Sequence, residues 1–405
     1  MQNYKDYNNA PRKQNNAILI LLIILVSLVL AVAVTGIVYM LKNPVGTQPP
    51  AVTTDPAVTT DAPVGDSTTE PSVTDAPVTD EPVADDRGIT FIGTPVASKQ
   101  IYMGDLILVN GDHAFDFSAN SAITASVTDL YPIWKEWPLY NYKVMNSSLK
   151  TTKRGAELIN PLFDAFLKET AADLGADLTN NDSISKIGIN DYMLTSFYRD
   201  MEEQEDTLKE MIDKYGSESA ALRYCALPGY SEHHTGLAFD CKVYTDDGVS
   251  YALGDEKMPV LYNWIYDNCA RFGFIHRYQA GKEQITGTAA ESWHFRYVGV
   301  PHAGVIKEKG FCLEEYIDFL KGYSYQNYLI VEADTVTYAI YYEAAKTETV
   351  VIPEVKDENG NIITPAGVTE QIPDTVTVHL PVGDVPYEIS GNNVDGFIVT
   401  ITIGK

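Results

Sequence analysis

The feature that most limits how this chain can fold is an uncharged, apolar run from Ala17 to Leu41. At about 1.5 Å per residue, a helix of this length crosses a hydrocarbon core of roughly 30 Å. We therefore predict a transmembrane helix over residues 17–41. A cleaved signal peptide with an A-x-A site at Ala31–Ala33 is the alternative, but the apolar run continues past that site.

Charges on the two sides of this run predict its orientation. Lys5, Arg12 and Lys13 precede it, whereas Lys42 is followed by a long stretch whose charged residues are all acidic. Short cytoplasmic segments carry an excess of Lys and Arg. Residues 1–16 are thus predicted to be a cytoplasmic tail, and the chain beyond the helix is predicted to lie outside the cell.

Residues 42–87 have the composition of a stalk. Pro, Thr and Asp dominate in a loose repeat of the form APVTD, and aromatic residues are absent. Such a segment buries too little apolar surface to offset the entropy lost on ordering, so we predict that it is disordered.

Net charge excludes one class of partner. The chain carries 29 Lys and Arg against 55 Asp and Glu, a formal net charge of −26. Binding to nucleic acid relies on basic patches that face phosphates, so no nucleic acid partner is expected. The composition leaves the oligomeric state open.

Ordered character begins near residue 88. Apolar residues at helical spacing predict helices over Lys153–Leu174, Met201–Tyr215 and Pro259–Phe272, with short strand-like runs between them. Because helices and strands do not alternate strictly, we predict an α+β domain over residues 88–323. Alternating β-branched runs separated by turn sequences then predict a small all-β module over residues 324–405.

The segment SEHHTGLAFD, residues 231–240, contains two adjacent histidines and ends in the carboxylate of Asp240. Strand periodicity after Gly236 places Phe239 on an apolar face and Asp240 on the opposite face. Gly236 supplies a turn that can bring His233 towards Asp240. A histidine nitrogen and a carboxylate oxygen would form half of a zinc site.

A second block, residues 287–299, supplies the other half. Aromatic residues alternate on one face of a predicted strand, which leaves His294 and Arg296 on the other. Glu291 precedes the strand, where it could act as a general base beside a metal ligand. Catalytic zinc sites keep three protein ligands and one open position for water, and these two blocks provide such a set.

These blocks resemble the zinc D,D-carboxypeptidases of the VanY type, which trim bacterial cell-wall peptides. The family signature S-x-H-x-x-G-x-A-x-D is present at Ser231, His233, Gly236, Ala238 and Asp240, and the signature E-x-W-H at Glu291, Trp293 and His294. The resemblance covers roughly residues 105–323. It implies a zinc D,D-peptidase domain of Hedgehog-like α+β fold. The predicted transmembrane helix, stalk and β module lie outside the resemblance.

The resemblance also implies the roles of individual residues. Zinc is expected to be held by His233, Asp240 and His294. Glu291 is expected to be the catalytic base, and Arg199 matches the family's arginine that polarises the scissile carbonyl.

Ser231, Gln204 and Arg296 are candidates for substrate binding, and Arg296 is equally a candidate for a structural ion pair. Two positions depart from the family pattern, because Phe197 stands where a glycine is usual and Gln279 where a proline is usual. Both departures concern the shape of the pocket rather than the metal.

The implied activity is hydrolysis of the terminal D-alanyl-D-alanine bond of peptidoglycan stem peptides by an enzyme anchored in the cell membrane of a Gram-positive bacterium and facing outward. The alternatives are an L,D-carboxypeptidase or endopeptidase on the same scaffold, or a non-catalytic, zinc-containing wall-binding module. A structural zinc site needs neither a base nor an oxyanion partner, so Glu291 and Arg199 favour the enzyme.

Other conspicuous residues are predicted to have structural roles. His234 falls on a variable position of the signature and is predicted to lie in the pocket or on the surface, without binding metal. The cysteines are expected either to form disulfides or to remain as buried thiols. These are Cys225, Cys241, Cys269 and Cys312.

Overall fold

The computed structural model describes residues 81–181, 192–244, 248–356, 362–364 and 367–404. The predicted transmembrane helix and most of the predicted stalk lie outside these residues. Within them, no helix is both long enough and apolar enough to cross a membrane.

A six-stranded sheet is the centre of the α+β part, which we define as residues 104–323. Its strand order is β4-β6-β7-β10-β9, with β8 paired to β7. β4 is parallel to β6, and the other pairs are antiparallel. The strands are β4 (Lys143–Val144), β6 (Tyr192–Ser196), β7 (Ala238–Tyr244), β8 (Ser250–Ala252), β9 (Phe274–Tyr278) and β10 (Glu291–Tyr297).

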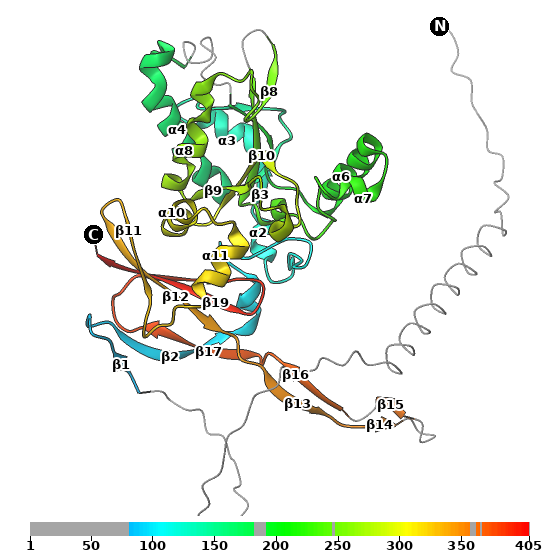
Figure 1. The fold of residues 1–405 in the computed structure, drawn as a ribbon, viewed down its shortest axis with the longest axis vertical. Helices are drawn as coiled ribbons and strands as arrows, with labels where there is room; N and C mark the ends of the chain where they lie inside the picture. The colour runs from blue at the N-terminus through cyan, green and yellow to red at the C-terminus, as the bar shows by residue number, and fades with distance from the viewer. Residues whose placement is uncertain (1–80, 182–191, 245–247, 357–361, 365–366, 405) are drawn as a thin grey trace, which may run out of the picture. The chain divides into compact units, whose positions relative to one another are not determined.

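Helices pack around this sheet (Figure 1). The helices predicted over Lys153–Leu174 and Met201–Tyr215 are confirmed as α4 and α6. The ring of Phe163 on α4 lies 5.4 Å from that of Tyr192 and 5.9 Å from that of Phe239, so α4 covers the apolar face of the sheet. Further helices of this part are α2 (Ser121–Ala125), α3 (Leu130–Glu136), α7 (Glu218–Ala221), α9 (Glu283–Thr286), α10 (Val300–Lys309), α11 (Leu313–Leu320) and the 3-10 helix η3 (Glu232–Thr235). A small separate sheet is formed by β3 (Val127–Asp129) and β5 (Lys150–Thr152).

The segment predicted as a helix over Pro259–Phe272 is helical from Val260 to Phe272, but it is divided into short pieces. The structure has three short segments there, which are η4 (Val260–Asn263), α8 (Trp264–Asn268) and η5 (Cys269–Phe272). Asparagines end the first two segments, and the side chain of Asn268 donates to the carbonyl of Trp264. Asparagine side chains compete for backbone hydrogen bonds, which weakens a continuous helix at these positions.

The C-terminal antiparallel β region is confirmed. We define the β-rich part as residues 81–103 and 324–404. One sheet has the order β1-β2-β17 and another the order β11-β12-β19-β18. Its elements are β1 (Val83–Ala84), β2 (Thr90–Ala97), η1 (Ser98–Tyr102), β11 (Leu329–Ala333), β12 (Val336–Ala344), β13 (Glu348–Ile352), β14 (Val355–Lys356), β15 (Ile362–Thr364), β16 (Gly367–Gln371), β17 (Thr375–Pro381), β18 (Tyr387–Gly391) and β19 (Gly396–Gly404).

The two larger sheets share one apolar core. Phe91 on β2, Val378 on β17 and Tyr341 on β12 are buried in the same cluster as Val399 on β19. β2 lies in the segment predicted as the α+β domain, yet it pairs along its length with β17 near the C-terminus. The chain therefore forms β1 and β2 of the β-rich part before it enters the α+β part. The predicted boundary at residues 323 and 324 stays a prediction.

A second apolar cluster joins the two parts. Leu106 and Leu108 pack with Ile317 of α11, and the same cluster includes Ile340 of β12 and Ile398 of β19. The β-rich part thus shares a buried core with α11 and with the segment that leads into the sheet.

Gly236 ends η3 in a conformation that favours glycine, with φ of 66°. A Cβ atom at this position would lie 2.6 Å from Cγ2 of Thr152, the residue whose hydroxyl caps α4. We predict that Gly236→Ala lowers the free energy of unfolding by about 2–4 kcal/mol, from backbone strain and overpacking together. Denaturant unfolding measures the change.

Gly287→Ala is the matched control. Gly287 has φ of 72°, but its Cβ would meet no atom within 4 Å. This variant should show the backbone cost alone, about 1–2 kcal/mol. Equal losses for the two variants would show that the contact with Thr152 contributes nothing.

Candidate metal centre

The pairing of β7 with β10 brings together residues from the two sequence blocks. His294 of β10 lies directly opposite Asp240 of β7 in the antiparallel register. Ser196 of β6 lies opposite Asp240 on the other side. Residues opposite each other on neighbouring strands have Cβ atoms about 4.5–5.5 Å apart, so this register alone places the two predicted ligands side by side.

η3 brings His233 to the same point. Its first turn is capped by Ser231, whose Oγ accepts from the backbone N–H of His233 at 3.4 Å. Nδ1 of His233 donates to the carbonyl of Phe197 at 2.5 Å. This hydrogen bond leaves Nε2 with its lone pair facing Asp240, whose Oδ2 lies 3.3 Å away.

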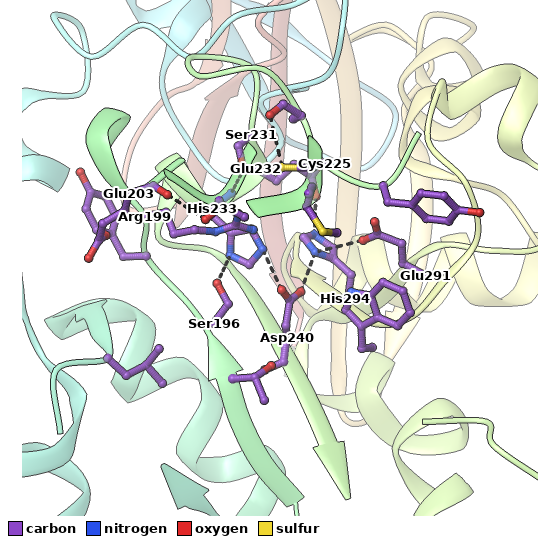
Figure 2. Close-up of a pocket in the computed structure, with 18 of the residues that line it drawn as sticks. Ser196, Arg199, Glu203, Cys225, Ser231, Glu232, His233, Asp240, Glu291 and His294 are labelled. Carbon is purple, nitrogen blue, oxygen red and sulfur yellow. Dashed lines mark hydrogen bonds and ion pairs between the residues drawn. The ribbon is translucent and has the colours of Figure 1, made fainter. Parts of the chain in front are cut away.

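The three side chains form a compact cluster (Figure 2). Figure 2 shows Asp240 between the rings of His233 and His294, with Glu291 on the far side of His294. Nδ1 of His294 lies 2.9 Å from Oδ1 of Asp240, and one ligand atom from each residue lies within 4.8 Å of the others. Among the described residues, this is the group of three that could hold a metal ion.

The donor set fits zinc. Two imidazoles and one carboxylate are ligands that catalytic zinc accepts, with a fourth position left for water. Nε2 of His233 is buried and has no hydrogen-bond partner, although most buried polar atoms have one. A metal ion bound beside Asp240 would supply that partner.

The pKa values of the two histidines move in opposite directions. Burial, followed by the nearby Arg199, lowers the pKa of His233 to about 4, so its ring is neutral and ready to bind metal. Burial also disfavours the charged ring of His294, but hydrogen bonds to Asp240 and Glu232 outweigh it and raise that pKa to about 9. A metal ion must therefore displace a proton from His294 when it binds at neutral pH.

Glu291 is the carboxylate beside this cluster. Its Oε2 lies 3.9 Å from Nδ1 of His294, and its side chain is 7% exposed. Burial is the main cause that raises the pKa of Glu291 to about 8. The charges of His294 and Arg199 lower this pKa, and the charge of Asp240 raises it. A carboxyl group with a pKa near neutrality is suited to exchange protons.

The cluster lies in the wall of a cavity of about 700 Å³. Arg199, Ser231 and Glu291 also line it. Arg199 stands in the loop between β6 and α6, and its backbone N–H donates to the carbonyl of His233. Its side-chain Nε is buried without a hydrogen-bond partner, so it can donate to a bound ligand.

Two predicted substrate-binding residues lie elsewhere. Among the described residues, the cavity lining includes neither Gln204 nor Arg296. Gln204 is buried behind the wall, where its amide donates to the carbonyl of Ala226. Arg296 is fully buried and pairs with Glu232, which is the arrangement of the structural alternative.

His234 is neither a pocket residue nor a surface residue, contrary to prediction. Its ring is fully buried. Nδ1 donates to the carbonyl of Arg199 at 2.7 Å, and Nε2 accepts from the N–H of Gly229 at 3.0 Å. Both ring nitrogens are used, so His234 fastens the Arg199 loop to the loop before η3.

No separate signal in the sequence points to Glu232, which the structure places among the charged groups behind His294. It lies inside the signature, between two residues that were assigned, and only three-dimensional contacts distinguish it from a surface residue. The cysteines are all free and buried, so the thiol alternative is confirmed and the disulfide alternative is wrong.

The two adjacent histidines allow a matched test of the metal site. We predict that His233→Gln lowers zinc affinity about 100-fold or more, because it removes one of three protein ligands. His234→Gln should leave zinc affinity within about threefold, while its lost hydrogen bonds lower stability by about 1–2 kcal/mol. Competition with a chromogenic chelator measures zinc affinity; an equal loss in both variants would contradict this assignment.

Comparison of the sequence with known proteins finds relatives that are carboxypeptidases. The VanY profile, described as D-alanyl-D-alanine carboxypeptidase, matches residues 166–300. A D-alanyl-D-alanine carboxypeptidase of Enterococcus faecium is 31% identical over 315 residues, covering 76% of this chain and 79% of that protein.

Two solved structures are also similar. The vancomycin resistance D,D-dipeptidase VanXYg, in complex with a D-Ala-D-Ala phosphinate analogue, matches with 25% identity and a TM-score of 0.55, covering 77% of this chain and 99% of its own. A mutant of the D,D-pentapeptidase VanY in complex with Zn(II) matches with 28% identity and a TM-score of 0.37, covering 53% of this chain and 98% of its own. Because the match to the Enterococcus faecium protein covers most of both chains, this chain belongs to the VanY family of D-alanyl-D-alanine carboxypeptidases.

Proposed function

We propose that this protein is a zinc D-alanyl-D-alanine carboxypeptidase that removes the terminal D-alanine from peptidoglycan stem peptides. The observation that carries this proposal is the buried cluster of His233, Asp240 and His294 with Glu291 beside it in one cavity. Three metal ligands and an adjacent carboxylate are the minimum for metal-assisted peptide hydrolysis, and family membership supplies the substrate class.

Each side chain has a definite task in this proposal. Bound zinc would acidify a water molecule and polarise the scissile carbonyl. Glu291 is the group that accepts a proton from water and returns it to the departing amine. In the metal-free protein its pKa is about 8, and a nearby cation favours the charged carboxylate that a base requires.

Arg199 is the fixed positive charge of the cavity. Its main chain is held by His233 and His234, and its side chain lines the cavity with Nε available for a ligand. We assign it to the carbonyl oxygen of the scissile bond, where a charged donor typically contributes several kcal/mol in the transition state. Ser231, in the same wall, is the candidate for the terminal carboxylate of the substrate.

We also propose that the enzyme is anchored in the cell membrane with its catalytic part outside. The apolar run from Ala17 to Leu41 and the basic residues before it support this arrangement. Stem peptides lie outside the cell, so the proposed orientation brings enzyme and substrate to the same side.

Substrate choice decides between the activities that this scaffold can support. The full-length chain, purified in detergent, would be incubated with stem pentapeptide, stem tetrapeptide and free D-Ala-D-Ala, with and without a chelator. We expect chelator-sensitive release of D-alanine from the pentapeptide. Release of D-alanine from the tetrapeptide alone would indicate an L,D-carboxypeptidase. Cleavage of free D-Ala-D-Ala would indicate a D,D-dipeptidase. No release from any substrate, with zinc bound, would contradict enzymatic function.

We predict that Glu291→Ala retains zinc but loses turnover by about 10²–10⁴-fold, the contribution typical of a general base. Zinc content and D-alanine release measure the two effects separately. Glu256→Gln, at an exposed carboxylate outside the cavity, is the control and should keep wild-type rates. A Glu291→Ala variant with normal turnover would show that the base is another group.

A further inference from the structure

Behind the metal cluster lies a carboxylate with no exposed atoms. Glu232 follows the capping residue of η3, and its side chain is 0% exposed. Its Oε1 accepts from Nε of Arg277 at 2.8 Å and from a terminal nitrogen of Arg296 at 3.0 Å. Its Oε2 lies 3.2 Å from Nε2 of His294.

These contacts divide the two oxygens of Glu232 between two tasks. Both arginines contact Oε1, so that oxygen is fully used. Oε2 is left to accept the proton on Nε2 of His294. An imidazole that keeps its proton on Nε2 offers the lone pair of Nδ1, and Nδ1 is the atom of His294 that faces Asp240.

We propose that Glu232 is a positioning residue that fixes the ring orientation and tautomer of His294, so that Nδ1 binds the catalytic metal ion. This inference rests on the proposed zinc enzyme and extends it to a residue outside the ligand set. Carboxylates that accept from the distal nitrogen of a histidine ligand orient the ring and raise its basicity.

The surroundings hold Glu232 in place. Arg277 forms two further hydrogen bonds with Glu314 at the start of α11, at 2.7 and 2.9 Å. Arg296 donates to the carbonyls of Asp105 and Ile107. The carboxylates of Glu232 and Glu314 thus balance two buried guanidinium groups, and both arginines that contact Oε1 are themselves held by other groups.

Glu232→Gln is the sharpest test, because it changes no shape. The two arginines donate only, so the amide oxygen of Gln must face them, and the amide NH₂ then faces Nε2 of His294. Two donors cannot face each other, so the ring is expected to carry its proton on Nδ1 instead. That proton occupies the nitrogen needed by the metal.

We expect Glu232→Gln to weaken zinc binding about 10–100-fold in chelator competition, the range typical of such supporting residues. At saturating Co²⁺, its visible absorption should also differ from wild type, because the ligand field at His294 changes. Circular dichroism and thermal unfolding of the metal-free protein report on folding. Glu315→Gln is the control, since Glu315 is on the same helix as Glu314 but pairs with the partly exposed Lys282.

Glu232→Asp keeps the experiment decisive if Glu232→Gln does not fold. Aspartate keeps the negative charge that the two arginines need, but its shorter side chain cannot reach both them and His294. Its zinc affinity should fall between those of the wild type and Glu232→Gln. Wild-type zinc affinity and Co²⁺ absorption in a folded Glu232 variant would overturn the positioning role, whereas failure of the wild-type protein itself to bind zinc would contradict the proposed function.

Discussion

The antiparallel register of β7 and β10 is the constraint on which the candidate centre depends. It sets Asp240 directly opposite His294, and a shift of one residue would turn one of them into the apolar core. The register is held from behind by aromatic side chains, because Phe239 and Phe295 are paired and stacked at 5.4 Å. The strand register that packs these two aromatic side chains in the core therefore also places Asp240 opposite His294.

The sequence predicted those features that depend on local periodicity. The bounds of α4 and α6 follow from their apolar spacing and from caps such as Thr152 and Gly175. The face of β7 that carries Asp240 follows from strict alternation along the strand. Residue types in the two blocks likewise indicated a zinc site, because the chemistry of zinc limits which side chains can serve, and the family resemblance then implied which residues are the ligands and the base.

The remaining features depend on contacts between distant segments, which periodicity does not report. Gln204, Arg296 and His234 are polar residues near the motifs, and only the folded chain shows that each one bonds inside the protein. Phe197 departs from the family pattern in its side chain, and its backbone carbonyl accepts the hydrogen bond from His233. A contact made by the main chain does not depend on which side chain is present.

The strand pairing of β2 with β17 bears on how the protein is made. β2 leaves the ribosome before every other described strand except β1, whereas its partner lies about 280 residues later in the chain. Such non-local pairing carries a large cost in chain entropy and forms slowly. Until β17 has been synthesised, β2 presents an unpaired edge that can associate with other chains. Truncation of the chain before β17 would therefore leave this edge of β2 exposed, in a segment far from the site of the truncation.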